Sequence, residues 1–138
     1  MGYWGVKSYE GDDASDALDA AFQQVHGDRY DELMDDGNPM PFDEVQLSLA
    51  DPRTLAVAVD ALAETFGTAP SDAWDDEQRL AFAGVVVRHA EAGVPIPAEQ
   101  ALLALGWLES EAVDWDEATV RMLRRRQEIA LLTKAPRS

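Results

Sequence analysis

The sequence predicts an all-α protein, an irregular bundle of five or six helices that follows an extended N-terminal arm. Apolar residues recur with helical spacing along most of the 138 residues. Aspartates stand before several of these stretches, at the position where a helix needs an N-cap. No two segments have the alternating pattern of paired strands. We therefore expect one helical domain over 1–138, with the arm in 1–11 and the bundle in 12–135.

The first predicted helix begins near Asp13 and extends to about residue 35. His26, Gly27 and Asp28 are expected to break or kink it, and 36–39 reads as a turn because it has the composition Asp-Gly-Asn-Pro. The helix is supported by one apolar stripe at positions i, i+3, i+4 and i+7, formed by Leu18, Ala21, Phe22 and Val25.

Two helices are predicted in the next part of the chain. A short one is expected near 43–49, with Asp43 as its N-cap. Another should begin after Asp51, because Pro52 in the first helical position loses no hydrogen bond there. Gly67 is the expected end of this second helix.

A helix with a wholly apolar segment is predicted to follow Asp75. Gln78 stands three residues after this cap and completes a capping box. The helix should extend to about residue 92, and its segment 80–87 is apolar on every side. A helix of this kind belongs at the centre of a bundle.

Two further helices are expected in the C-terminal third. Asp114 should cap the last one, with Glu117 three residues later, and this helix frays near Pro136. The helix before it is opened by Pro97 and carries these apolar residues: Leu102, Leu103, Leu105, Trp107 and Leu108.

The composition excludes several classes of function. The chain has no cysteine, so it forms no disulfide, no thiolate metal site and no cysteine nucleophile. Its net charge of −16 repels nucleic acid and anionic membranes and attracts a basic protein. No segment approaches the roughly 20 apolar residues of a membrane span, and 1–5 lacks the features of a secretory signal. We expect a cytoplasmic protein, and the composition leaves its oligomeric state open.

The acidic residues divide into two groups. One group consists of predicted helix caps, each of which stabilises its helix by about 1 kcal/mol. The other group lies in the N-terminal third, where like charges at helical spacing repel each other. We predict that this second group forms a partner-docking surface, while a solvated surface and a weak cation site stay open as alternatives. Its members are Asp12, Asp16, Asp19, Asp28, Asp31, Glu32 and Asp35.

The two histidines are the basis of an alternative function. His26 and His89, with Glu91 or other carboxylates, could bind zinc if the fold brought them together, which would make the chain a metal-binding bundle or a metal-dependent hydrolase. His89-Ala90-Glu91 is similar to the His-x-Glu of zinc deaminases, but the cysteine pair of that site is absent. The competing interpretation of His89 is a hydrogen-bonded residue at the edge of the core. We predict no catalytic residue and no cofactor, because no nucleotide loop or serine-hydrolase motif occurs.

The N-terminus has a family resemblance. The residues Met1-Gly2-Tyr3-Trp4-Gly5 and then Tyr9-Glu10-Gly11-Asp12-Asp13-Ala14-Ser15-Asp16 resemble the start of an uncharacterised bacterial family, domain of unknown function 4259. Members of that family begin Met-Gly-x-Trp-Gly and continue aromatic-Glu-x-Asp-x-Ala-x-Asp. The resemblance covers about the first 20 residues, with Tyr9 where Phe is more usual. It implies a small bacterial cytoplasmic protein of immunity type, found beside toxin systems, and it implies no catalytic residues.

The leading functional prediction is a non-enzymatic acidic interaction protein. It would dock a basic partner, as an inhibitor or an immunity-type protein does. The prediction depends on the acidity between Asp12 and Asp36, which helix capping does not explain.

Overall fold

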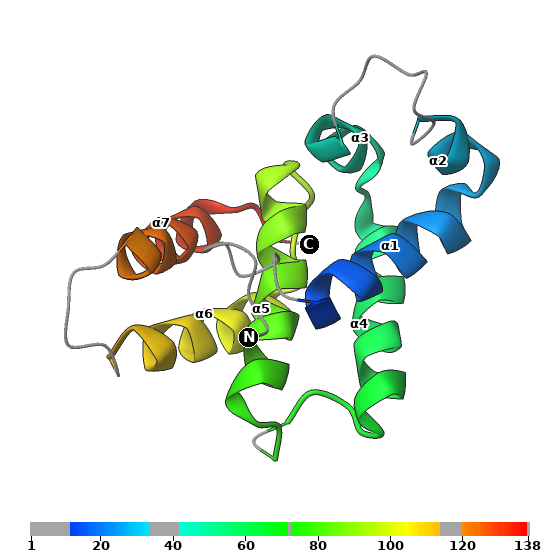
Figure 1. Ribbon diagram of the computed structural model, residues 1–138. Coiled ribbons are helices and arrows are strands. Elements are labelled where there is room, and N and C mark those ends of the chain that lie inside the picture. Colours follow the sequence, from blue (N-terminus) through cyan, green and yellow to red (C-terminus); the bar gives the residue numbers. More distant parts are fainter. Residues whose placement is uncertain (1–11, 34–41, 72, 114–119, 138) are drawn as a thin grey trace.

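The computed structural model describes residues 12–33, 42–71, 73–113 and 120–137, and it confirms the all-α fold (Figure 1). Within these residues the only β-type pairing is an isolated bridge between Ile96 and Arg137. None of the described helices is long and apolar enough to cross a bilayer. The seven described helices are α1 (Asp12–His26), α2 (Asp28–Leu33), α3 (Phe42–Leu49), α4 (Pro52–Phe66), α5 (Asp76–Glu91), α6 (Ala98–Val113) and α7 (Val120–Lys134).

The described residues contain seven helices where five or six were expected, because Gly27 separates α1 from α2. Gly27 has a left-handed φ of 47°, which a residue with a side chain rarely adopts. Its N–H still donates to the carbonyl of Gln23 at 2.9 Å, as at the end of a helix. The predicted break is therefore confirmed, and the residues after it form a separate helix.

The predicted start and end of α4 are confirmed. The Thr54 N–H donates to Asp51 Oδ1 at 2.8 Å, and the Asp51 N–H donates to Thr54 Oγ1 at 2.9 Å. Pro52 occupies the first helical position, and Gly67 ends the helix with a φ of 79°. The sequence thus predicted the N-cap Asp51 and the N1 residue Pro52, whereas the capping box that Asp51 forms with Thr54 was not foreseen.

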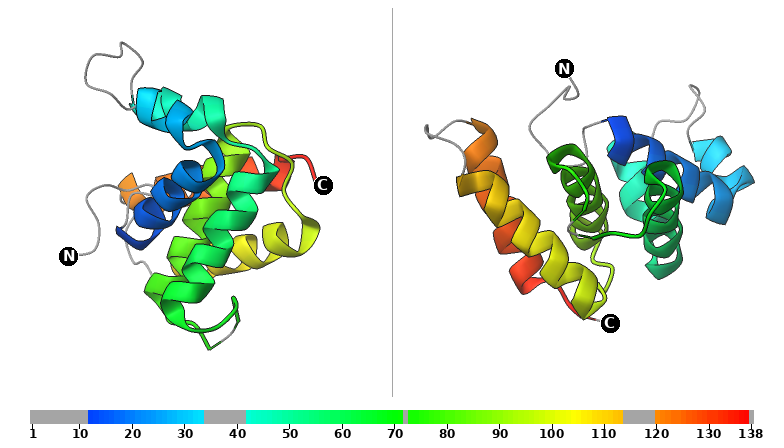
Figure 2. Two further views of the ribbon diagram at one scale, coloured as in Figure 1. Left: turned by 90° about the vertical axis from the view of Figure 1, so that its right-hand side faces the viewer. Right: turned by 90° about the horizontal axis from the view of Figure 1, so that it is seen from below.

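Helix α5 occupies the centre of the fold, as predicted. Asp75 and Gln78 form its capping box, with backbone-to-side-chain hydrogen bonds of 2.9 and 3.0 Å. Every residue in 80–90 is buried. Figure 2 shows α5 between the α6–α7 pair on one side and the α1–α4 pair on the other, and α5 packs against all four of these helices. Its apolar surface is therefore covered from several directions.

One prediction about the other helices was wrong. Asp43 lies inside α3, which begins at Phe42, so Asp43 belongs to the first helical turn and not to the N-cap position. Leu102 does not face the core, because its exposed fraction is 67%. Helix α6 buries Ala101, Ala104 and Leu108 instead, and a stripe at this spacing turns Leu102 toward solvent. The cap predicted at Asp114 lies outside the described residues.

Aromatic side chains join the end of α4 to α5 and α6. Trp74 is buried and contacts Phe66 edge-to-face at 5.0 Å between ring centroids. Trp107 stacks on Trp74 at 6.0 Å and meets Phe82 edge-to-face at 5.3 Å. Ring pairs of this geometry add to the stabilisation from burial. Trp74 thus belongs to the core and offers no exposed anchor for a partner.

Candidate functional site

The predicted docking residues lie on the outer side of α1 and α2. Helix α1 turns Ala14, Leu18 and Phe22 into the core, where it packs against α4 and α5. The opposite stripe of α1 is left in solvent, as the helical spacing predicted. We call five of the exposed carboxylates of α1 and α2 the acidic face, and these are Asp16, Asp19, Asp28, Asp31 and Glu32. Asp35 and the side chain of Asp12 lie outside the described part of the chain.

Two hydrogen bonds hold the acidic face in shape across the break at Gly27. The Tyr30 hydroxyl donates to Asp19 Oδ1 at 2.7 Å, and Gln23 Nε2 donates to Asp31 Oδ2 at 3.2 Å. Tyr30 itself is buried, and its ring stacks on Phe22 at 5.7 Å between centroids. Helix α2 is therefore attached to α1 by an aromatic contact beneath the acidic face and by polar contacts within it.

The acidic face keeps most of its negative charge. Among the described residues its one close cation is Arg29, whose Nη1 lies 3.6 Å from Glu32 Oε2, and both side chains are well exposed. A pair so open to water contributes little. Asp16 and Asp28 have no hydrogen bond or ion pair within the described residues. This face can attract a cationic group, and the partly engaged carboxylates can accept hydrogen bonds from it.

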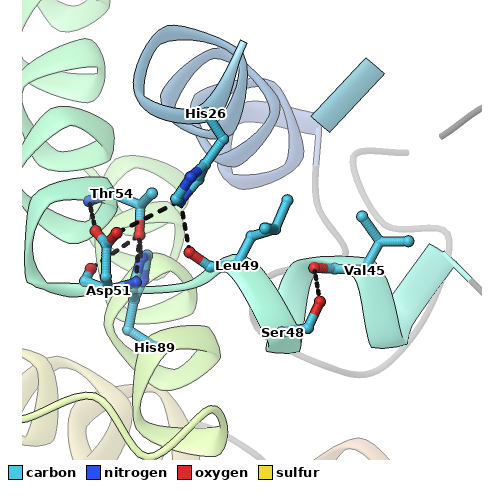
Figure 3. Close-up of polar contacts among 7 residues, drawn as sticks. All are labelled: His26, Val45, Ser48, Leu49, Asp51, Thr54 and His89. Carbon is cyan, nitrogen blue, oxygen red and sulfur yellow. Dashed lines mark hydrogen bonds and ion pairs between the residues drawn. The ribbon is translucent and has the colours of Figure 1, made fainter. Parts of the chain in front are cut away.

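The two histidines lie beside the N-terminal cap of α4 (Figure 3). His26 is the last residue of α1, and its Nε2 lies 2.7 Å from the carbonyl oxygen of Leu49 at the end of α3. A carbonyl only accepts, so His26 Nε2 carries a hydrogen and donates it. The same nitrogen lies 3.4 Å from Asp51 Oδ2. His26 therefore connects the ends of α1 and α3 with the start of α4.

His89 lies on the buried side of the same cap. Its Nδ1 donates to the carbonyl of Val85 at 2.8 Å, and its Nε2 lies 2.8 Å from Thr54 Oγ1. Burial lowers the pKa of His89 below its ordinary value of 6.5, and the charge of Arg88 acts in the same direction. The bond to Val85 and the charge of Asp51 partly oppose this shift. His89 is thus a neutral, hydrogen-bonded histidine at neutral pH, and it is buried in the core, not only at its edge.

The histidines are joined by hydrogen bonds and not arranged as metal ligands. Within the described residues, no three His, Asp or Glu side chains form a group that could hold a metal ion. His26, His89 and Glu91 are therefore not gathered into the alternative site. His89 has both ring nitrogens in hydrogen bonds, so it offers no lone pair unless one bond is given up. Thr54, which sequence reasoning did not single out, links His89 to the cap.

Comparison with known proteins adds no relative. No family model, no curated protein and no solved structure matches the chain. The N-terminal resemblance stays a prediction, and most of the residues that carry it lie outside the described part of the chain. The acidic face and the histidine network are therefore the features of the chain that bear on its function.

Proposed function

We propose that this chain is a non-enzymatic interaction protein that docks a basic partner protein through its acidic face. The observation that carries the proposal is the exposure of Asp16 and Asp28, which have no neutralising contact in the described part of the chain. The partner would supply lysine or arginine side chains to these carboxylates. A cytoplasmic inhibitor or immunity-type protein that covers a basic surface of its target would act in this way.

Electrostatics and preorganisation both support the proposal. A net charge of −16 speeds the encounter with a basic partner and disfavours acidic competitors. Asp19 and Asp31 are each held through one oxygen, by Tyr30 and Gln23. Side chains that are already held lose less conformational freedom on binding, so a larger part of each contact appears as affinity.

The first test is the dependence of partner capture on salt and on the acidic face. The immobilised protein is incubated with an extract of its source cells at about 50 mM and about 500 mM salt, because the higher concentration screens charges beyond a few ångströms. We expect a captured basic protein at the lower concentration and its loss at the higher one. The double variant Asp16→Asn with Asp28→Asn should lose the same protein at about 50 mM salt.

A matched control removes equal charge elsewhere. Asp60 and Glu64 are exposed on α4. Like those of Asp16 and Asp28, their side chains form no hydrogen bond or ion pair within the described residues. The double variant Asp60→Asn with Glu64→Gln should therefore retain the captured protein. If both double variants lose it equally, net charge and not the acidic face attracts the partner. Capture that persists at about 500 mM salt would contradict an electrostatic docking surface.

A further inference from the structure

The hydroxyl of Thr54 has two acceptors within reach but only one hydrogen to donate. Its Oγ1 lies 2.9 Å from the carbonyl oxygen of Asp51 and 2.8 Å from His89 Nε2. It also accepts the Asp51 N–H at 2.9 Å. A hydroxyl donates one hydrogen bond and accepts up to two. The three contacts are therefore compatible with two different arrangements of hydrogens.

In the first arrangement His89 is neutral. Its Nδ1–H donates to Val85, so Nε2 holds a lone pair and accepts the Thr54 hydroxyl. The Asp51 carbonyl, which then receives nothing from Thr54, still accepts the Leu55 N–H at 3.2 Å. No polar atom of the network is left without a partner in this state.

In the second arrangement His89 is protonated. Both ring nitrogens then carry hydrogens, and Nε2–H donates to Thr54 Oγ1. The hydroxyl turns and donates to the Asp51 carbonyl, while it continues to accept the Asp51 N–H. We propose that Thr54 and His89 form a proton-dependent relay, in which the hydroxyl of Thr54 reverses its direction when His89 gains a proton and the cap of α4 stays hydrogen-bonded in both states.

Groups on α4, α5 and α1 surround His89 and influence whether it binds a proton. The charge of Asp51, at the start of α4, favours protonation of His89, while Arg88, its neighbour on α5, opposes it. On the α1 side, the Phe22 ring lies almost parallel to His89 at 6.2 Å between centroids. Desolvation by these apolar contacts also opposes the charged form.

His26 and Asp51 lie on the partly exposed side of the relay. The His26 side chain is 22% exposed, that of Asp51 is 38% exposed, and the two lie 3.4 Å apart. The relay is independent of the docking proposal, since none of its residues belongs to the acidic face.

The first experiment determines which nitrogen of His89 carries the hydrogen. In the full-length protein with ¹⁵N-labelled histidine, long-range ¹H–¹⁵N spectra near pH 7.5 should show the Nδ1–H tautomer. As His89 titrates, amide exchange of Asp51 should stay slow on both sides of the transition, because its N–H keeps Thr54 Oγ1 as acceptor. An Nε2–H tautomer in the neutral state, or rapid exchange of the Asp51 amide in the protonated state, would overturn the relay.

Two variants of Thr54 separate the hydroxyl from the side-chain shape. Thr54→Ser keeps the hydroxyl, and His89 should titrate as in the wild type. Thr54→Val keeps the shape but removes the acceptor for the charged Nε2–H, and hydrogen bonds of charged groups are stronger than neutral ones. We expect proton binding by His89 to be about tenfold weaker in Thr54→Val. Equal titration of the valine and wild-type proteins would overturn the proposal, and the tautomer measurement decides it if the valine variant does not fold.

Discussion

Asp51 illustrates how one residue can serve several parts of the fold. Its Oδ1 caps α4 through the Thr54 N–H, and its Oδ2 lies 3.4 Å from His26. Asp75 performs only the first of these tasks, since within the described residues its side chain accepts from Gln78 alone. The two aspartates therefore allow the contribution of a cap to be separated from that of the histidine contact.

We expect Asp75→Ala to lower the free energy of unfolding by about 1 kcal/mol, because the N-terminal amides of α5 lose their side-chain acceptor. Asp75→Asn should cost less, since asparagine caps about as well as aspartate. Urea unfolding followed by circular dichroism measures both effects. Asp51→Ala should cost more than Asp75→Ala, and equal losses would show that the contact with His26 adds nothing to stability.

The pH dependence of stability should carry a contribution from His89. Its pKa is lowered in the folded protein, mainly by burial, so the unfolded chain binds this proton more tightly. The contribution is fully present above the unfolded value of 6.5 and is lost as the pH falls through the lower folded pKa. Urea unfolding at several pH values below 7 should show a decline in the wild type that is reduced in His89→Gln. The same decline in both proteins would contradict the assignment to His89.

Residue-level prediction succeeded only for partners that are close in sequence, although closeness alone was not enough, since the bond of Thr54 to the Asp51 N–H was not foreseen. The capping box of Asp75 and Gln78 needs residues only three positions apart, so the sequence pattern was sufficient. The contact between Thr54 and His89 joins residues 35 positions apart, and only the packing of α4 against α5 brings them together. For the same reason the sequence could suggest His26 and His89 as a pair but could not show that Asp51 and Thr54 stand between them.

At the scale of elements, Gly27 decides where α1 ends and how α2 is presented. Gly27 has a φ of 47°, and the space around it would admit a Cβ. The nearest neighbour of that Cβ would be the Gln23 carbonyl oxygen at 3.8 Å. The cost of a side chain there would therefore come from the backbone conformation and not from a collision.

We expect Gly27→Ala to lower the free energy of unfolding by about 1 kcal/mol and Gly27→Asn to lower it less, because asparagine tolerates the left-handed conformation. Hydrogen exchange should also become faster at the amides of α2. Gly67→Ala is the matched control, since Gly67 has a left-handed φ of 79° and open space around it, but it lies at the end of α4. Equal acceleration of α2 exchange in both variants would show that Gly27 has no specific role in holding α2.

The faces of helices were predictable to different degrees. The segment 80–87 of α5 is apolar on every side, so the central position of this helix followed from the sequence alone. Helix α6 has apolar residues on more than one face, and which of them is buried depends on the neighbouring helices. The close packing of α6 uses Ala101 and Ala104, whereas the larger Leu102 lies in solvent. Apolar character alone did not indicate this choice, because single exposed leucines are common.

At the scale of the whole molecule, the net charge of −16 acts on stability as well as on partners. Folding brings the carboxylates closer together than they are in the extended chain, so self-repulsion opposes the compact state. The caps at Asp51 and Asp75 offset part of this cost locally, whereas the acidic face keeps its charge in solvent. A surface retained against such repulsion is the part of the molecule where a functional constraint is expected.

Raising salt from about 10 mM to about 150 mM should therefore raise the melting temperature, because the Debye length falls from about 30 Å to about 8 Å. At about 10 mM salt, removing a negative charge and removing a positive charge should change the free energy of unfolding in opposite directions. Glu64→Gln should stabilise the protein by a few tenths of a kcal/mol, since Glu64 places a negative charge near the C-terminal end of α4. Lys134→Gln, at the last residue of α7, should destabilise it by a similar amount.

These two variants make a matched pair, because both side chains are exposed and lie near helix C-termini. Neither forms a hydrogen bond or ion pair within the described residues. Urea unfolding at about 10 mM and about 500 mM salt, monitored by tryptophan fluorescence, gives the free energies. The two differences should have opposite signs at about 10 mM salt and should shrink together at about 500 mM, where charges are screened within a few ångströms. Differences that persist at high salt would mean that side-chain packing, and not the field of the acidic chain, determines them. The double variant Asp60→Asn with Glu64→Gln would then no longer be a purely electrostatic control for docking.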